Sequence, residues 1–218
     1  MLVRKYRTSD RKQVEDIHFE TGFLGSSMSR LLSNNLLWKK NITYYLEKES
    51  ESIFVLENKN KVVGYLFGCL NDANNNETRS FVLHTLKNLM LSLFLPRKDK
   101  VFWRNQFMTL LHTLTGNSEE MNFKTPKNAG HIHINLLPLA RGRNLGTKLL
   151  KEFENYAKKK RIKLIHADSF RRPKKSNAQF WLKNGFTVYS EVKTSIWKNQ
   201  LPDEQIDLVC YAKNLTLS

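Results

Sequence analysis

Hydrophobic and polar positions along the first third of the chain follow two periods, one helical and one extended. Apolar residues recur at helical spacing after the capping sequence Thr8-Ser9-Asp10, and again after Gly25. Two later runs are rich in strand-forming residues and are joined by the short polar link Lys59-Asn60, which predicts a hairpin. The pattern therefore predicts a short strand, two helices and two paired strands, at residues 3–6, 11–23, 27–46, 52–58 and 61–70.

The middle of the chain predicts a helical insertion. A polar, Asn-rich loop at 71–80 is followed by two apolar segments of helical period, 81–95 and 101–114, with Pro96 between them and Gly116 after the second. Helices this apolar must be covered on most sides. Three alternatives remain open: the insertion packs on the core, lines a substrate cleft, or meets a second subunit in a homodimer.

The second half of the chain has the pattern of a parallel crossover. An alternating strand from His131 breaks at Pro138 and a small basic loop, and an amphipathic helix and another strand follow. The remaining elements are a short helix and two strands that we expect to be antiparallel, at 176–185, 186–192 and 206–215. This order predicts one α/β (α+β) domain over residues 1–218. Its mixed, mostly antiparallel sheet has about seven strands flanked by helices, with the insertion (about 80–116) between the third and fourth strands.

Composition limits the class of protein, its compartment and the metal and membrane partners to be expected. Hydrophobic residues make up 40% of the 218 and aromatic residues 11%, as in globular proteins. Cys69 and Cys210 lie in apolar runs, so we expect buried free thiols, and no spacing of Cys or His is typical of a metal site. The N-terminus has no apolar signal-peptide core, and the segment 81–95 is too short and too polar to span a bilayer. We therefore expect a cytoplasmic protein with no membrane partner and no metal.

The net charge of +16 favours anionic partners such as nucleic acid, a membrane surface or a phosphorylated small molecule. The alternative is a solvated, lysine-rich surface. No nucleic-acid-binding motif is present, and the basic residues are not interleaved with aromatic residues in one strip. This pattern disfavours a nucleic-acid-binding module.

The segment from His131 to Leu150 carries the clearest candidate chemistry. A strand that ends in a glycine-containing loop and leads into a helix presents unpaired N–H groups and the positive end of the helix dipole. Gly142 and Gly146 allow the backbone to approach a bulky phosphate, and Arg141, Arg143 and Lys148 add full positive charges. The segment predicts a phosphate or pyrophosphate site, but it matches neither GxGxxG nor GxxxxGK[ST]. A basic turn without a ligand is the alternative.

The stretch LLPLARGRNLGTKLL resembles the acetyl-CoA-binding motif of the GNAT N-acetyltransferase superfamily, R/Q-x-x-G-x-G/A after a strand and a proline. Arg141 takes the first position and Gly146 the last, while Asn144 stands where the middle glycine is usual; Asn tolerates left-handed backbone better than other residues with a side chain. FWLKNGF (180–186) resembles a second family signature, FYxxxGF. HIHINLLP, TGFLG and VVGYLFG look most like the branch related to the acetyltransferase-like domain found with O-GlcNAcase and its bacterial relatives, which also carries a helical insertion.

The resemblance implies which residues bind acetyl-CoA, the expected co-substrate. The strand end at Leu136 and Leu137 would bond the acetyl and pantetheine groups through its backbone, and an N–H group near Leu137 would polarise the acetyl carbonyl. The loop would cradle the pyrophosphate through its N–H groups. Arg171, Arg172 and Asn177, which precede the later short helix, would lie near the adenosine end of CoA. The implied cofactor-binding residues are Leu136, Leu137, Arg141, Gly142, Arg143, Asn144, Leu145, Gly146, Thr147, Asn177 and Trp181.

The residues for proton transfer are less clear. The family's usual acid is a tyrosine at the position of Trp181, whose indole cannot give up a proton near neutral pH. Two alternatives stay open: the CoA thiolate leaves without help, or Tyr189 or Tyr211 replaces the usual acid. His133, which shares a strand face with Asn135, is the predicted base because its ordinary pKa suits the role. A structural histidine bonded within the sheet is the alternative, and His131 on the same face competes for the assignment.

Three functions follow in order of preference. The first is an acetyl-CoA-dependent N-acetyltransferase that acts by direct transfer on a primary amine of a small-molecule or peptide acceptor, for which the positive charge would favour anionic groups. The second is a catalytically silent acyl-CoA-binding GNAT fold with a regulatory or partner-binding role, suggested by Asn144 and Trp181. The third is the nucleic-acid-binding module, suggested by charge alone.

Overall fold

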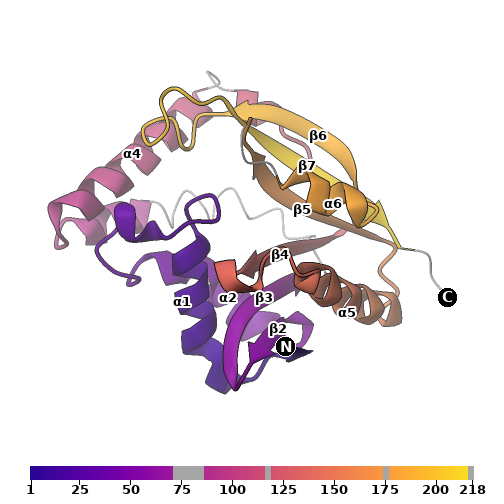
Figure 1. Ribbon diagram of the computed structural model, residues 1–218. Helices are drawn as coiled ribbons and strands as arrows, with labels where there is room; N and C mark the ends of the chain where they lie inside the picture. Colours follow the sequence, from indigo (N-terminus) through magenta and orange to yellow (C-terminus); the bar gives the residue numbers. More distant parts are fainter. Residues whose placement is uncertain (71–85, 116–118, 174–176, 216–218) are drawn as a thin grey trace.

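The computed structural model describes residues 1–70, 86–115, 119–173 and 177–215. Its sheet has seven strands in the order β1-β2-β3-β4-β5-β7-β6, and every neighbouring pair is antiparallel except β4 and β5 (Figure 1). The strands are β1 (Leu2–Lys5), β2 (Phe54–Asn58), β3 (Lys61–Cys69), β4 (Gly130–Leu136), β5 (Leu164–Arg171), β6 (Thr187–Thr194) and β7 (Ile206–Asn214). The predicted seven-stranded, mostly antiparallel sheet is confirmed.

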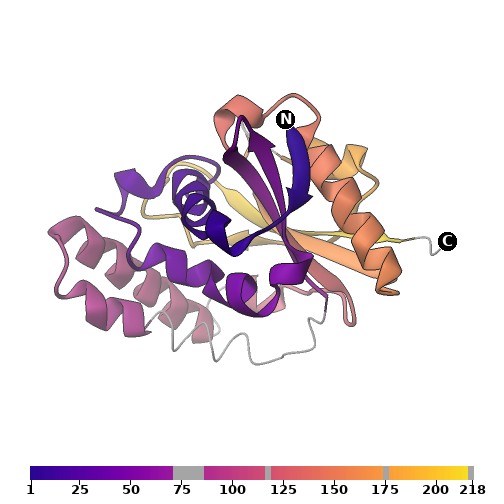
Figure 2. The same ribbon diagram turned by 90° about the horizontal axis from the view of Figure 1, so that it is seen from below.

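Helices cover both faces of this sheet, as Figure 2 shows for α5 on one side and α1 on the other. The α-helices are α1 (Arg11–Thr21), α2 (Thr43–Lys48), α4 (Arg97–Leu114), α5 (Leu145–Lys159) and α6 (Ala178–Lys183). Short 3-10 turns lie between them: η1 (Thr8–Asp10), η2 (Met28–Arg30), η3 (Trp38–Ile42), η4 (Ser50–Ser52), η5 (Glu119–Asn122) and η6 (Pro138–Ala140).

Strand alternation divides the apolar side chains between the two faces. On one face, Ile132 of β4 and Tyr211 of β7 pack with Phe153 of α5 and Trp181 of α6. Gly68 is needed on that face, because a Cβ there would lie 1.9 Å from Cε2 of Phe153. On the other face, β2 and β3 pack against α1 and α2. The polar side chains that alternate along β4 therefore point toward α1 and α2, since its apolar side chains point toward α5.

The second predicted helix, over residues 27–46, is wrong for most of its length. The structure has two 3-10 turns, η2 and η3, and only the six-residue helix α2 beyond them. The Ser-Asn-Asn sequence at 33–35 makes bonds that compete with helix. One is local, since the Asn34 side chain accepts from the Leu36 N–H at 2.8 Å, and one is a tertiary contact, in which the Ser33 N–H donates to Asp99 of α4. Apolar spacing at a helical period did not reveal this competition.

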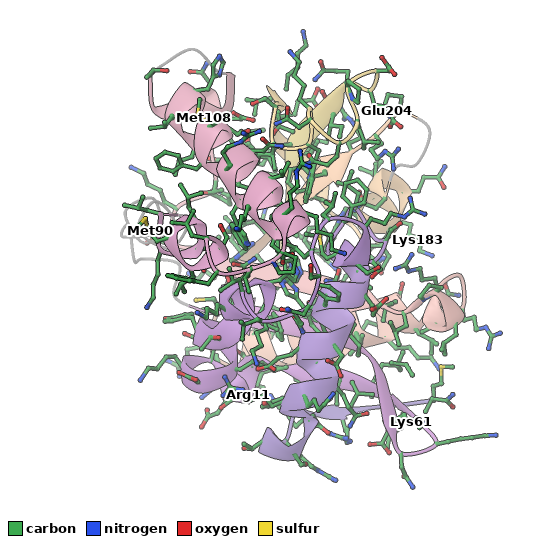
Figure 3. The ribbon with its side chains drawn as sticks, turned by 90° about the vertical axis from the view of Figure 1, so that its left-hand side faces the viewer. Arg11, Lys61, Met90, Met108, Lys183 and Glu204 are labelled. Atoms are coloured by element: carbon green, nitrogen blue, oxygen red, sulfur yellow. The ribbon has the colours of Figure 1, made fainter. Side chains whose placement is uncertain are left out.

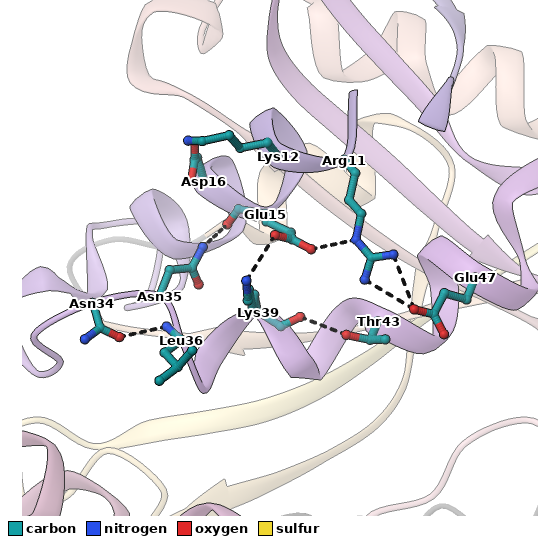
Figure 4. Close-up of polar contacts among 10 residues, drawn as sticks. All are labelled: Arg11, Lys12, Glu15, Asp16, Asn34, Asn35, Leu36, Lys39, Thr43 and Glu47. Carbon is teal, nitrogen blue, oxygen red and sulfur yellow. Dashed lines mark hydrogen bonds and ion pairs between the residues drawn. The ribbon is translucent and has the colours of Figure 1, made fainter. Parts of the chain in front are cut away.

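An ion-pair network fixes α1 against η3 and α2 (Figure 4). Arg11 contacts Glu15 at 2.9 Å and Glu47 of α2 at 3.3 Å, and Lys39 of η3 contacts Glu15 at 3.8 Å. Asn35 adds a hydrogen bond to the backbone carbonyl of Glu15. These contacts hold in place the helix that carries His18 over the polar side of β4.

The insertion lies between β3 and β4, as predicted, and its described part is helical at 86–92 and in α4. Phe102 and Trp103 of α4 pack with η2 and the β6–β7 loop, in agreement with the core alternative for this face. Other apolar side chains point outward, among them Met90 and Met108, each 57% exposed (Figure 3). The predictions made for residues 71–85 and for Gly116 concern residues outside those that the structure describes.

One further expectation is met. Cys69 and Cys210 are buried free thiols. Within the described part of the chain, no helix has both the length and the apolar character needed to cross a bilayer.

Candidate acetyl-CoA site

The parallel pair β4 and β5 separates soon after it begins. Only Gly130 and His131 of β4 pair with Ile165 and His166 of β5, although β4 stays paired with β3 as far as Leu136. We call the opening beyond these two residue pairs the β4–β5 split. The β4 backbone between Ile132 and Leu136 thus presents an unpaired strand edge to the split, and residues 133–137 are all partly exposed.

Strand alternation shows which amides face the split. The Leu137 N–H donates to the carbonyl of Val63 at 2.9 Å, so the backbone groups of 133, 135 and 137 point toward β3. The N–H groups of Ile134 and Leu136 therefore point into the split. The sequence predicted that an N–H near Leu137 polarises the acetyl carbonyl, and this stays a prediction. The Leu137 amide itself is already used, so the adjacent amide of Leu136 is the one turned toward the opening.

Arg141 has a different role from the one expected of a motif arginine. Its N–H donates to the Pro138 carbonyl at 3.1 Å, and its guanidinium donates to the carbonyls of Leu136 at 2.9 Å and Gly25 at 2.7 Å. These bonds tie the end of β4 to the turn that follows α1. Arg141 therefore shapes the loop, and neither its amide nor these guanidinium N–H groups are left to hold a phosphate in this conformation.

The loop itself has the geometry of an anion cradle. Gly142 and Asn144 are both left-handed, with φ of +73° and +56°. Asn144 is the N-cap residue of α5, a 15-residue helix whose first-turn N–H groups, at Leu145, Gly146 and Thr147, open toward the loop. Gly146 is closely packed, because a Cβ there would lie 3.0 Å from Phe180 and 3.4 Å from Leu136, and these side chains would have to shift slightly to admit it.

Two features of this loop were missed from the sequence. Lys183 of α6 donates to Oδ1 of Asn144 at 3.2 Å, which brings another positive charge to the N-terminus of α5. No sequence signal pairs these residues, because they are 39 positions apart and belong to separate motifs. Thr147 Oγ1 is buried and has no hydrogen-bond partner among the described residues. Arg143 is exposed, so its side chain is accessible at the loop surface.

A model of the acetyltransferase (GNAT) family matches residues 26–186, which is 161 of the 218 residues. The chain belongs to this family. The match includes β4, the loop and α5, whose geometry is described above. No curated protein matches the chain by sequence.

Solved structures agree with this GNAT fold. The chain is similar to a protein titled SsHAT, with 21% identity, a TM-score of 0.61, and coverage of 99% of this chain and 98% of that one. It is also similar to a polyamine N-acetyltransferase of Drosophila melanogaster that forms N-acetylagmatine (13% identity, TM-score 0.61, 98% and 99% covered). A third is the Salmonella typhimurium protein yncA, solved with its cofactor acetyl-CoA (13% identity, TM-score 0.57, 99% of this chain and 94% of that one covered).

In this GNAT chain Trp181, at the position of the family's usual acid, is part of the core, and Tyr189, one of its two predicted replacements, lies away from the split. Trp181 is buried, with its ring centroid 5.1 Å from that of Phe186 and 6.0 Å from that of Tyr211, and its indole N–H has no hydrogen-bond partner among the described residues. Tyr189 is 52% exposed on the edge strand β6, and both β7 and β5 separate it from β4. Two intervening strands place it roughly 14 Å from β4, which is too far for a direct proton donor to the split.

His133 is held in a hydrogen-bonded chain beneath α1. Its Nε2 lies 3.2 Å from Nδ2 of Asn135, which also donates to the Tyr65 hydroxyl at 2.9 Å, and that hydroxyl lies 2.9 Å from Nδ1 of His18. Desolvation lowers the pKa of His133 to about 4. Because Nε2 is engaged and the ring is a weak base, this geometry favours the structural alternative over the predicted role as base, and Asn135 belongs to the same chain.

The remaining cofactor candidates lie at the start of α6. Asn177 donates to Ser169 Oγ of β5 at 2.5 Å, so it joins α6 to β5. The neighbouring basic residues are ion-paired: Arg171 with Glu191 and Asp207, and Arg172 with Glu204. A role of these residues toward the adenosine end of CoA stays a prediction.

Proposed function

We propose that this protein is an N-acetyltransferase that moves an acetyl group from acetyl-CoA to a primary amine of its acceptor by direct transfer. The observation that supports this most is the β4–β5 split, whose open strand edge leads straight to the left-handed loop and the N-terminus of α5. A cytoplasmic location is proposed with it. The likeness to the O-GlcNAcase-linked branch stays a prediction.

The residues of the site fit acetyl-CoA. A pantetheine arm carries amide groups that can pair with a strand edge, and the N–H groups of Ile134 and Leu136 offer that edge. The hydroxyl of Thr147, which is buried and has no partner in the part of the chain that the structure describes, stands in the first turn of α5, where a phosphate oxygen could accept a hydrogen bond from it. When bound, acetyl-CoA supplies a thioester carbonyl for attack by an amine; this chain contributes the amides that orient it.

Charge narrows the acceptor class. A protein with a net charge of +16 repels polycations and attracts anions, so a polyamine acceptor like that of the Drosophila neighbour is disfavoured. We propose a small-molecule or peptide amine that also carries an acidic group. A screen should compare matched amines with and without a carboxylate or phosphate.

Thr147→Val tests the cofactor site. This change removes only the buried hydroxyl and nearly keeps the shape of the side chain. We expect unfolding stability to stay equal or rise, because an unsatisfied polar group is removed, and acetyl-CoA affinity in calorimetry to fall by about 10-fold or more, as for the loss of a hydrogen bond to a charged group. Thr147→Ser should restore binding. Equal affinities of the wild-type and Val proteins would contradict this phosphate contact, and no binding by the wild type would refute the function.

Trp181 favours a second candidate, a protein that binds acyl-CoA without transferring the acyl group. Its buried indole occupies the position of the family's usual acid and donates no proton. Release of free CoA thiol in the amine screen separates the two candidates. Turnover with any amine supports the enzyme, whereas tight binding of acetyl-CoA with no thiol release across the screen supports the silent protein.

A further inference from the structure

Three potential metal ligands converge at the closed end of the β4–β5 split. They are His131 of β4 and His166 and Asp168 of β5, and one ligand atom from each lies within 4.8 Å of the other two. The ring centroids of His131 and His166 are 4.9 Å apart. His166 is buried, and His131 and Asp168 are partly exposed.

The sheet itself creates this arrangement. His131 and His166 are direct partners in the parallel register, so their side chains stand side by side. Asp168 follows His166 by two residues and therefore points to the same face. All three lie opposite Ile132, Ile165 and Ala167, which face α5, so they point to the side of α1 and α2. A sequence search for metal spacing missed them because 35 positions separate the two histidines.

We propose that His131, His166 and Asp168 form a binding site for a divalent transition metal, with zinc as the best match. Imidazole nitrogen and carboxylate oxygen are ordinary zinc ligands, and bond lengths of about 2.0–2.2 Å place such ligand atoms about 3.4 Å apart in a tetrahedron. Side-chain rotation can close the remaining separation. A site with three protein ligands keeps one position open for water or a substrate group, as catalytic zinc sites do.

A supporting contact orients one of the ligands. The Tyr45 hydroxyl lies 3.3 Å from Nδ1 of His131, which leaves Nε2 as the nitrogen for a metal. The Tyr45 ring is itself fixed against Phe67, with centroids 5.4 Å apart and planes within 9°. Metal-bound histidines usually have such a partner on the other ring nitrogen. The site lies at the closed end of the split, on the same two strands whose open part is assigned to the thioester.

Metal titration of the full chain tests this site. Protein stripped with a chelator is titrated with Zn²⁺ against a chromophoric competitor, and with Co²⁺ for the visible absorption of a low-coordinate site. We expect one equivalent to bind, and binding at least 100-fold weaker in His131→Ala and in Asp168→Asn. His112→Ala removes an exposed histidine of α4 and should leave the affinity unchanged.

The controls keep the outcome decisive. Circular dichroism shows whether each variant is folded, and Asp168→Asn keeps the shape of the side chain if the alanine variant unfolds. Each of three outcomes would overturn the proposal: the wild type does not bind the metal, both site variants keep the wild-type affinity, or only His112→Ala loses binding. Acetyl-CoA calorimetry on the stripped protein is independent of these results, so failure of the metal site and failure of the acetyltransferase proposal are distinguishable.

Discussion

Substitution of Asn144 tests whether the departure from the family glycine is tolerated for conformational reasons. Asn144 is left-handed with φ of +56° and precedes Leu145 and Gly146, both buried in the core. Left-handed backbone costs about 1–2 kcal/mol for most residues with a side chain, less for Asn, and nothing for Gly. Because the buried residues fix the loop before any ligand arrives, the penalty should appear in folding stability and not in ligand affinity.

We expect the wild type and Asn144→Gly to be about equally stable, Asn144→Ala to be less stable, and Asn144→Val to be the least stable. Asn144→Ala should lower the free energy of unfolding by about 1 kcal/mol, or the melting temperature by about 2–4 °C. Asn144→Gly should stay within about 0.5 kcal/mol, because relief of strain is offset by the greater entropy of the unfolded chain and by loss of the exposed Lys183 contact. Asn144→Val should be worst, since β-branched residues are outliers at positive φ.

Thermal and urea unfolding measure this order. Calorimetry should find that the acetyl-CoA affinities of the three variants lie within about threefold of the wild-type affinity, a difference under 1 kcal/mol. Asn128, also left-handed at φ +56° but located before β4, is the matched control: Asn128→Ala should cost similar stability and leave binding unchanged. The reasoning is refuted if Asn144→Ala is as stable as the wild type. It is also refuted if that variant stays stable but binds acetyl-CoA tenfold more weakly, because the loop would then form only on binding.

Three further predictions concern the packing around the site. Gly68→Ala should destabilise by about 1–3 kcal/mol or more in thermal unfolding, because the new Cβ would overlap the buried ring of Phe153; an unchanged melting temperature would contradict the close packing of β3 and α5. Trp181→Phe should lower stability by about 1–3 kcal/mol but keep acetyl-CoA binding, and loss of binding by the folded variant would contradict a packing role. Burial lowers the pKa of His18 to about 3, against about 6.5 when unfolded, so the unfolded state binds more protons between these values. The contribution of His18 to stability therefore falls by about 1.4 kcal/mol per unit as pH decreases through that window, in addition to the contributions of His131 and His133, whose pKa values burial also lowers. His18→Phe should flatten this slope in urea titrations from about pH 6.5 to pH 4, and equal slopes would contradict it.

The sequence predicted well wherever local chemistry decides the structure. The strand, proline, basic loop and helix after His131 form as expected, because the proline and the left-handed Gly142 and Asn144 require little help from distant residues. The final strands and the helical insertion also follow from periodicity alone. The helix predicted over 27–46 failed because bonds of Ser33 and Asn34 to Asp99 and Leu36 outweighed an apolar spacing that looked helical.

The candidate site was harder to predict because its decisive contacts join distant segments. The role of Arg141 depends on the Gly25 carbonyl, 116 residues away, and no local pattern reveals that bond. The pKa of His133 depends on burial beneath α1, which lowers it to about 4. An unperturbed pKa of about 6.5 made this residue look like a base, and only the fold shows that Asn135 already occupies its nitrogen.

Arg141 connects the two halves of the proposed site. Its Nε–H donates to the Leu136 carbonyl at the end of β4, and the amide of the same residue faces the split. Its Nη2 donates to the Gly25 carbonyl in the turn that follows α1, formed by Leu24 and Gly25. Both turn residues are left-handed, with φ of +50° and +86°, so the position of the Gly25 carbonyl is set by a conformation that few residues adopt. The α1 side, which carries His18 over the polar face of β4, is thereby fixed to the loop that would hold the pyrophosphate. An arginine that binds backbone on both sides couples the position of the loop to α1, whereas the left-handed conformation at position 144 is one that asparagine itself adopts with little strain.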